Sequence, residues 1–165
     1  MPQPKELRLI AFRTGPQTFV IDIMAVRQII VYGGTTAVPA APPFVEGIVV
    51  VRSEVIPVID LRERFGIDDA QRSPRPLVLI TETSAGPIGL KVDEVRRIVN
   101  VSTDAFLPPP AIVGAIRGDL LIAIVEQDDE VYLLLDVESV LTADEKTELQ
   151  SAELSSEESR GTSGR

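Results

Sequence analysis

The chain contains no cysteine and no histidine. Without cysteine it has no disulfides, no thiol nucleophile and no thiolate metal site. Without histidine it lacks the commonest general base, the commonest transition-metal ligand and the usual phosphohistidine acceptor. Tryptophan is absent and aromatic residues make up 4% of the chain, which does not suit a surface that stacks nucleic-acid bases or proline-rich peptides. These absences exclude much of enzyme chemistry.

Acidic side chains outnumber basic ones by 25 to 16, so the formal net charge is −9 and the isoelectric point is near 4.5. A surface of this sign repels phosphate backbones, which argues against nucleic-acid binding. No apolar run approaches the ~20 residues that a membrane-spanning helix needs. The first residues, Met1-Pro2-Gln3-Pro4, lack the basic and apolar segments of a secretory signal. We therefore expect a cytoplasmic protein that does not insert into a membrane.

The motifs of phosphate-binding loops, dinucleotide-binding turns and nucleophile elbows are absent as well. A carboxylate-dependent hydrolase that uses Asp60 and Glu63 is one alternative, because paired carboxylates can do acid–base work or bind a metal. Arg62 and Arg64 alternate with them, however, which favours a solvated charged turn. Asp128-Asp129-Glu130 lacks the spacing of a calcium loop and is better interpreted as a hairpin tip. The sequence predicts no enzyme, no metal and no cofactor.

With 165 residues, of which 44% are hydrophobic, the chain is long enough for one domain or for two small halves that share an interface. From Thr142 onward the apolar residues give way to Asp, Glu, Ser, Gly and Thr. A segment of that composition cannot bury enough apolar surface to offset the entropy of ordering it. We expect a folded region over residues 1–150, ending in a short helix, and an acidic disordered tail over 151–165.

The body consists of short apolar segments separated by turn residues, which is typical of a β-barrel or sandwich. Residues 14–17 and 81–86 each separate two such segments, as the turn of a hairpin would. The spacing leaves no room for the long helices of a parallel-sheet fold. The expected strands are 7–13, 18–21, 47–51, 55–59, 76–80, 87–92, 111–117, 120–125 and 131–135, and the expected short helices are 22–26, 61–65 (ended by Gly66) and 137–141.

Two patterns recur along the chain in the same order. Val26-Arg27-Gln28-Ile29-Ile30 resembles Val95-Arg96-Arg97-Ile98-Val99, 69 residues later, and Ile59-Asp60-Leu61 resembles Leu135-Asp136-Val137, 76 residues later. In the second pattern the aspartate ends an apolar strand and opens a short helix, where its carboxylate can accept hydrogen bonds from free amides. The recurrence predicts two related half-barrels with a boundary at roughly 66–76, the alternative being chance similarity among apolar β segments.

Several ordered strings carry a resemblance to a known family. They are Phe19-Val20-Ile21-Asp22-Ile23-Met24-x-Val26, Pro42-Pro43-Phe44-Val45-Glu46-Gly47-Ile48, Val51-Arg52-x-x-Val55-Ile56-Pro57-Val58-Ile59-Asp60-Leu61-Arg62 and Ile88-Gly89-Leu90-x-Val92-Asp93-x-Val95. Over roughly residues 7–141 the chain resembles the bacterial chemotaxis coupling protein CheW family. The resemblance implies an all-β fold of two five-stranded SH3-like barrels packed together, with short helices.

The resemblance also implies a function. It suggests a non-catalytic adaptor that joins chemoreceptors to a CheA-type histidine kinase, so the expected partners are that kinase and the helical cytoplasmic tip of a receptor. Recruitment to receptor arrays at the inner membrane would follow. The chain has no room for the phosphotransfer, dimerisation and ATP-binding modules of the kinase itself. A divergent paralogue serving another chemosensory or surface-motility kinase pathway is the alternative.

The resemblance and the repeat together point to a receptor-binding groove between the barrels. If the two repeats face each other, their apolar residues would line a groove that can seat the apolar stripe of a helix. For each residue the alternative is an ordinary place in the core. The residues expected in the groove are Val26, Ile29, Val95 and Ile98, joined by Leu77 and Val78 from the family pattern.

Three further positions have expected roles. The resemblance places kinase contacts near Phe44 and Gly47, although a glycine at that position can equally serve a sharp turn from loop to strand. Arg52 stands between two apolar strands and is expected to be a structural anchor, because a guanidinium can bridge several carbonyls or a carboxylate. A partner contact and a solvated turn are its alternatives. The chain departs from the family at four places. It has Gln28 where an acidic residue is usual and Ile30 where a polar or basic residue is frequent. It has Val50-Val51 where Asn-Leu is common and Ser53 where glycine is usual.

Overall fold

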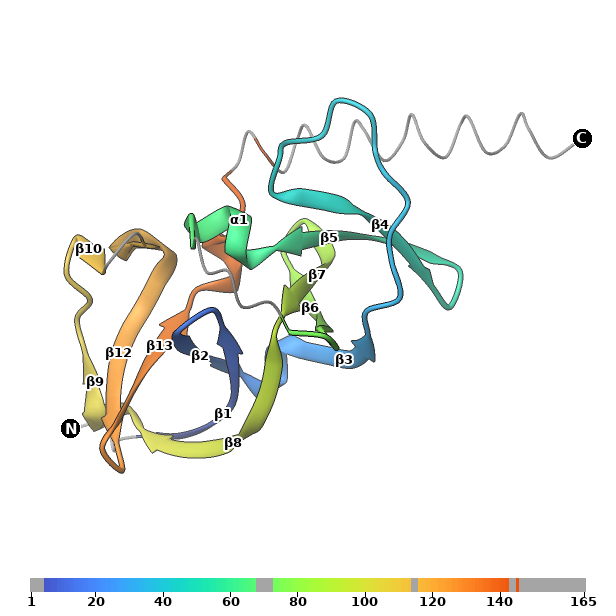
Figure 1. Ribbon diagram of the computed structural model, residues 1–165. Helices are drawn as coiled ribbons and strands as arrows, with labels where there is room; N and C mark the ends of the chain where they lie inside the picture. Colours follow the sequence, from blue (N-terminus) through green and yellow to red (C-terminus); the bar gives the residue numbers. More distant parts are fainter. Residues whose placement is uncertain (1–4, 68–72, 114–115, 143–144, 146–165) are drawn as a thin grey trace, which may run out of the picture.

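The computed structural model describes residues 5–67, 73–113, 116–142 and 145, and these are mostly in short strands (Figure 1). Turn residues separate the strands, and the helical elements are each one turn or little more. The elements are β1 (Glu6–Thr14), β2 (Gln17–Asp22), η1 (Ile23–Ala25), β3 (Val26–Val31), β4 (Val45–Val51), β5 (Glu54–Asp60), α1 (Leu61–Phe65), β6 (Leu77–Thr83), β7 (Gly86–Val92), β8 (Glu94–Ser102), η2 (Thr103–Ala105), β9 (Phe106–Leu107), β10 (Ile112–Val113), β11 (Ile116–Arg117), η3 (Gly118–Leu120), β12 (Leu121–Gln127), β13 (Glu130–Leu135) and η4 (Val137–Ser139).

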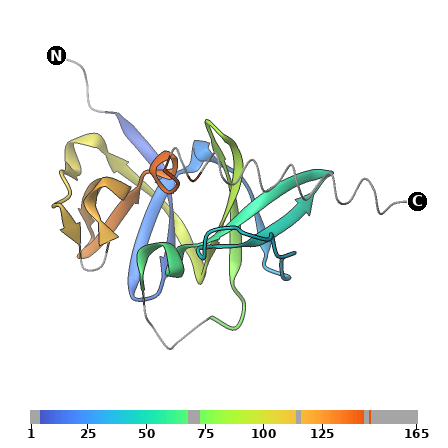
Figure 2. The ribbon, with the colours of Figure 1, turned by 90° about the horizontal axis from the view of Figure 1, so that it is seen from above.

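The strands form two main sheets, each curled into a small barrel (Figures 1 and 2). The first barrel has the strand order β8-β1-β2-β13-β12-β9, and the second has the order β3-β6-β7-β5-β4. The expected all-β fold of two packed barrels is confirmed. The first barrel has six strands and not five, because the two-residue β9 pairs with β12.

The two barrels do not divide the chain at residues 66–76. The first hairpin of each sequence repeat belongs to the barrel that the rest of the other repeat forms. Hairpin β1–β2 lies in one sheet with β8, β12 and β13, and hairpin β6–β7 lies in the other sheet with β3, β4 and β5. Parallel pairing of β2 with β13 and of β5 with β7 completes this exchange. A boundary at 66–76 lies between the two sequence repeats. It does not divide the two barrels, because each barrel contains a hairpin from the other side of that boundary.

Most of the expected strands are present, with differences at the repeat motifs. The repeated segments form β3 and β8, which were not expected as strands, and the expected strand 111–117 is replaced by the short β10 and β11. The helices expected at 22–26 and 137–141 are the single turns η1 and η4. The disorder expected for 151–165 lies outside the described residues.

The second repeated pattern is confirmed by its hydrogen bonds. Asp60 accepts the backbone N–H of Arg62 at 3.0 Å at the start of α1, and Asp136 accepts that of Glu138 at 3.1 Å at the start of η4. The short aspartate side chain accepts a hydrogen bond from a backbone N–H group that has no partner within the helix. As expected, Gly66 ends α1 in the left-handed region, with φ of 65°.

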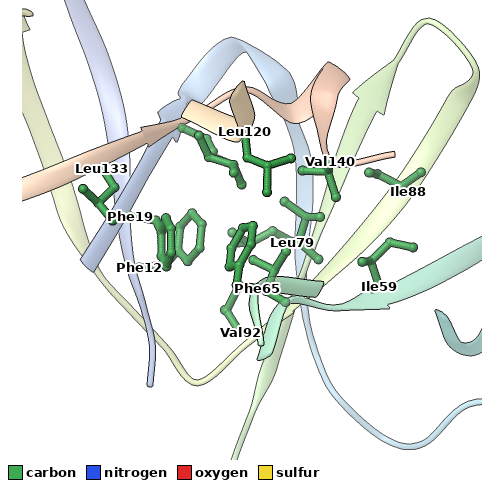
Figure 3. Close-up of a cluster of buried hydrophobic side chains, with 14 of the residues drawn as sticks. Phe12, Phe19, Ile59, Phe65, Leu79, Ile88, Val92, Leu120, Leu133 and Val140 are labelled. Atoms are coloured by element: carbon green, nitrogen blue, oxygen red, sulfur yellow. The ribbon is translucent and has the colours of Figure 1, made fainter. Parts of the chain in front are cut away.

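Three apolar clusters fill the molecule, and the largest lies between the barrels. Two smaller clusters, around Val125 and Val58, each draw on one sheet and fill the inside of one barrel. The largest draws on both sheets and on α1; in it Phe19 stacks on Phe12 and Phe65, with ring centroids 5.7 and 5.0 Å apart (Figure 3). Because this shared core is continuous, neither barrel can separate without exposing it to water.

Candidate partner-binding surfaces

The two repeat motifs lie on corresponding edge strands. β3 is one edge strand of the second barrel's sheet, at the end opposite β4, and β8 is one edge strand of the first, at the end opposite β9. Both strands lie on the lower side of the molecule in Figure 1. The sequence repeat therefore places two related strands at the margins of their sheets, where one side of each strand has no paired neighbour.

The apolar residues of these strands continue the faces that form the shared core. Ile29 pairs with Leu79 and Ile98 pairs with Ile10, and directly opposed residues of antiparallel strands point to the same face of a sheet. Leu79 and Ile10 are buried in the shared core, whereas Ile29 is 42% and Ile98 48% exposed. The core thus extends to solvent at its β3 and β8 margins.

Val26 and Val95, the other two groove candidates, are half-buried and pack against the shared core. Leu77 does the same. Val78 does not belong with them: it is fully buried inside the second barrel, where it packs with Ile56 and Ile80. Because successive residues of a strand point to opposite faces, Leu77 and Val78 cannot both face the same surface. The groove assignment is wrong for Val78.

Val31 is an exposed apolar residue that the sequence reasoning missed. It lies opposite Leu77 at the end of β3, on the same face as Ile29, and is 71% exposed. Its alternation with Ile29 is the signal that could have identified it, had 26–31 been expected as a strand. We use the name β3–β8 surface for Val26, Ile29, Val31, Leu77, Val95 and Ile98.

The arginine in each repeat motif has a corresponding ionic partner. Arg27 of β3 binds Glu54 at 2.6 Å and also contacts Glu82, and Arg96 of β8 lies 3.5 Å from Glu130. Glu54 and Glu130 each follow the turn of a hairpin, β4–β5 and β12–β13 respectively. Each arginine therefore connects the edge strand of its barrel to the hairpin at the far side of the same sheet. This accounts physically for the recurrence of the Val-Arg pair.

Glu130 is also the centre of a small polar cluster with Arg97 and Tyr132. Arg97 donates to Glu130 at 2.8 Å and to the Tyr132 hydroxyl. The hydrogen bond from Tyr132, with help from the two arginine charges, lowers the pKa of Glu130. Burial, together with Glu130, raises the pKa of Tyr132. At neutral pH the cluster therefore holds an ionised carboxylate and a neutral phenol.

Gly47 and Phe44, the expected kinase contacts, have structural roles of their own. Gly47 is buried in β4 with φ of 156°, and a methyl group there would overlap the carbonyl oxygen of Thr36 and lie 2.7 Å from Thr35 Oγ1. Phe44 is 9% exposed and belongs to the shared core. The structure therefore explains the glycine by close packing, and Val50, 53% exposed near the end of the same strand, is the more accessible residue.

Arg52 is not the structural anchor that was expected. It is exposed, it adopts a φ of 49° in the two-residue turn between β4 and β5, and Ser53 follows with 67°. Among the residues that the structure describes, none forms a hydrogen bond or ion pair with Arg52. The turn itself is held by its backbone conformation, positive φ at both central positions, and not by the guanidinium.

The anchoring arginine is Arg62, in α1. Its guanidinium binds the Asp93 carboxylate through Nε at 3.2 Å and a terminal nitrogen at 2.6 Å, and both side chains are 8% exposed. Asp93 also accepts the backbone N–H of Gly15 at 2.7 Å. Because these residues belong to α1, the β7–β8 junction and the β1–β2 turn, the pair joins elements of both barrels.

The solvated charged turn expected at 60–64 is therefore wrong for Asp60, Arg62 and Arg64. Asp60 and Arg62 are each 7% exposed, because α1 lies against the shared core, while Glu63 points to solvent. Asp60 caps the helix, so the carboxylate pair of the hydrolase alternative occupies two different environments. The hairpin expected at 128–130 is confirmed, with φ of 54° and 62° at Asp128 and Asp129.

A second contact missed from the sequence involves Arg64 and Glu145. Arg64 donates two hydrogen bonds to Glu145, both at 3.1 Å, and its guanidinium carbon lies 4.7 Å from the centre of the Phe44 ring. The signal that could have found it is Thr142-x-x-Glu145, the capping-box motif that opens a helix. The sequence reasoning expected a short helix that fades into a polar tail there, but not this contact with α1.

The described parts of the chain contain no group of three Asp or Glu side chains placed to hold a metal ion. They also contain no helix with the length and apolar character to cross a membrane. The structure offers two candidate partner-binding surfaces: the β3–β8 surface, and the region of β4, its hairpin turn and α1.

Comparison with known proteins agrees with this architecture. The model of the CheW-like domain matches residues 8–145. "Chemotaxis protein CheW" of Rhizobium meliloti is 31% identical over 138 residues, which cover 84% of this chain and 89% of that protein. "Protein FrzA" of Myxococcus xanthus is 26% identical over 73% of this chain and 75% of its own length.

Among solved structures, the scaffolding protein TtCheW of Thermoanaerobacter tengcongensis superposes with a TM-score of 0.78 at 27% sequence identity, covering 88% of this chain and 92% of that one. The match extends over both barrels, because it covers nearly all of each chain. With its family-model match over residues 8–145, the chain belongs to the CheW-like family of chemotaxis scaffold proteins.

Proposed function

We propose that this protein is a non-catalytic adaptor that couples chemoreceptors to a CheA-type histidine kinase in chemotaxis signalling. The observation that carries the proposal is the β3–β8 surface, where the apolar core shared by the two barrels extends into solvent at Ile29, Val31 and Ile98. Family membership supports the chemotaxis assignment. The work of such a protein is to hold two partners, and it needs two separate surfaces for this.

The β3–β8 surface suits a helical receptor tip. Its exposed members are aliphatic, and they lie on two strands from different barrels. An amphipathic helix binds such a surface by burying the residues of one apolar stripe. Half-buried Val26 and Val95 would form the floor beneath the helix, since both pack on the shared core.

The kinase is proposed to bind the second barrel near the β4–β5 hairpin. Val50 and Arg52 are exposed there, and no described residue binds Arg52, so its guanidinium is available to a partner carboxylate. Gly47 lies farther from the turn, opposite Val58, and Phe44 precedes the other end of β4, where its carbonyl accepts the Asp60 N–H. The proposal keeps the kinase and receptor on different elements, so that the protein can hold both at once in arrays beneath the inner membrane.

The first experiment places a charge on the β3–β8 surface. In Ile29→Asp and Ile98→Asp the new carboxylate would be desolvated under a receptor helix without a partner, which costs several kcal/mol of binding. Both positions are about half exposed, so the free protein should keep its melting temperature. We expect receptor binding to fall at least tenfold in both variants while kinase binding is kept.

The matched control is Val131→Asp, which changes an equally exposed valine (54%) on β13. It should bind the receptor like the parent protein. The kinase arm uses Val50→Asp and Arg52→Ala, which should weaken kinase binding and leave receptor binding intact. A folded Ile29→Asp protein with full receptor affinity would contradict the receptor site, and an absence of kinase binding by the parent protein would contradict the coupling function.

A further inference from the structure

The apolar β3–β8 surface ends in two polar residues on one side. In the antiparallel pairing of β1 with β8, Ile10 lies opposite Ile98, and two residues along Arg8 lies opposite Asn100. The bulge in this pairing falls after Ala11, so the strands alternate regularly over this stretch. Residues two apart on a strand point to the same face, so Arg8 and Asn100 continue the face of the β3–β8 surface. Both are exposed.

Arg8 differs from the other arginines of these strands because it has no ionic partner. β1, β3 and β8 carry five arginines in all. Within the residues that the structure describes, nothing forms a hydrogen bond or an ion pair with the Arg8 side chain. The guanidinium of Arg8 is therefore available to a carboxylate from outside the chain. The other four arginines each form an ion pair with a glutamate; they are Arg13, Arg27, Arg96 and Arg97.

We propose that Arg8 is a specificity-determining residue of the receptor site, where it binds an acidic side chain of the receptor helix beside the apolar stripe that covers Ile98. Arg8 and Ile98 are diagonal neighbours on one sheet face. Such neighbours lie about 7–8 Å apart, within reach of a long side chain. The amide of Asn100 can donate a hydrogen bond to the same carboxylate. This inference rests on the proposed function, because it takes the β3–β8 surface as the receptor site.

The charge of the protein explains why one arginine can set specificity. The net charge is −9, so the protein as a whole repels an acidic helix and attracts it only where a cation stands unpaired. Moving the helix by one turn, about 5.4 Å, would separate its carboxylate from Arg8. The aliphatic residues of the surface therefore provide affinity, whereas Arg8 selects the register of the helix and disfavours helices with a basic residue at that position.

The experiment measures binding of the cytoplasmic tip fragment of a receptor from the same organism. Arg8→Met removes the charge but keeps a long apolar side chain, and Arg8→Lys keeps the charge. At about 50 mM NaCl we expect Arg8→Met to bind about fivefold more weakly, mainly through slower association, and Arg8→Lys to keep most of the affinity. The deficit of Arg8→Met should shrink at about 500 mM NaCl, because salt screens exposed charges.

Arg52→Met is the matched control. Arg52 is also exposed and has no ionic partner among the described residues, but it lies in the β4–β5 turn. The control makes the same change in net charge and should leave receptor binding unchanged, and both methionine variants should keep the melting temperature of the parent protein. Unchanged affinity of Arg8→Met at low salt would overturn the inference, and so would an equal loss in Arg52→Met.

Double-mutant cycles locate the carboxylate on the receptor. Each Asp or Glu of the receptor fragment is changed to its amide and tested against the parent protein and Arg8→Met. One of these changes should weaken binding to the parent protein but not to Arg8→Met. Receptor binding without any such coupled position would overturn the role of Arg8 alone. Absence of receptor binding by the parent protein would contradict the proposed function, and this inference with it.

Discussion

Asp93→Asn should be among the most destabilising conservative substitutions in this chain. The carboxylate of Asp93 binds Arg62 through two contacts, accepts the amide of Gly15 and lies 3.6 Å from the Arg13 guanidinium. Asparagine has nearly the same shape, but it has one acceptor oxygen and no charge. The substitution therefore leaves Arg62 with its charge buried and only partly compensated, and it turns an NH2 group toward one of the former donors.

The size of the effect follows from burial. Removing one partner of a buried ion pair costs about 3–5 kcal/mol, whereas an exposed pair is worth about 0–1 kcal/mol. Both side chains are 8% exposed, so the buried case applies, and the remaining asparagine oxygen places the expected loss near the lower limit, about 3 kcal/mol. For a domain of this length that corresponds to a fall in melting temperature of roughly 10 °C.

Urea unfolding followed by far-ultraviolet circular dichroism measures this loss, since the chain has no tryptophan to report by fluorescence. Asp119→Asn is the control, because the Arg117–Asp119 pair is 61% and 68% exposed and should contribute less than ~0.5 kcal/mol. A loss below ~1 kcal/mol in Asp93→Asn would refute the argument that this pair joins the two barrels. Faster amide exchange at Gly15 is the local signature expected with the loss.

Three further predictions concern single positions. Ser53→Gly should raise the free energy of unfolding by about 1 kcal/mol, because Ser53 has a φ of 67° that glycine adopts without steric cost; an unchanged urea midpoint would contradict it. Gly47→Ala should lower the free energy of unfolding by about 2–4 kcal/mol through overlap with the Thr36 carbonyl, and a wild-type melting curve would refute this. Glu130 has a lowered pKa, so its contribution to stability is present above the unfolded pKa near 4.5 and is lost as the pH falls through the folded value. Glu130→Gln should therefore reduce the loss of stability as the pH falls below about 4.5, and an identical pH profile would count against the cluster with Tyr132.

The sequence predicted the fold class because short β structure has local signals. Hairpin turns, β-branched runs and the helix-opening Asp60 and Asp136 each depend on residues within a few positions, and the structure confirms them. β3 and β8 were not expected as strands, because their apolar residues alternate imperfectly and a bulge interrupts the pairing of each. A bulge shifts the face to which residues point, which hides the period of two.

The candidate surfaces were predicted less well than the fold. Ile29 and Ile98 are partly exposed, as residues of a docking surface must be. Val78, expected in the groove, is fully buried, and Arg52, expected to be an anchor, is exposed. Identity alone does not determine burial. An arginine is anchored only where a carboxylate is brought to it, and here the chain brings Asp93 to Arg62 and leaves Arg52 at a hairpin tip.

The sequence by itself determined the hairpins, the capped helix starts and the internal repeat, since these depend on neighbouring residues and their preferred backbone angles. Only the tertiary structure decided which barrel each hairpin joins. The exchange rests on parallel pairs between distant strands, such as Phe19 with Leu133 and Ile59 with Leu90, and any apolar strand can pair with several others. The shared core selects among these pairings, because the exchanged arrangement buries both faces of β1, with Leu9 and Ala11 inside the first barrel and Ile10 and Phe12 between the two.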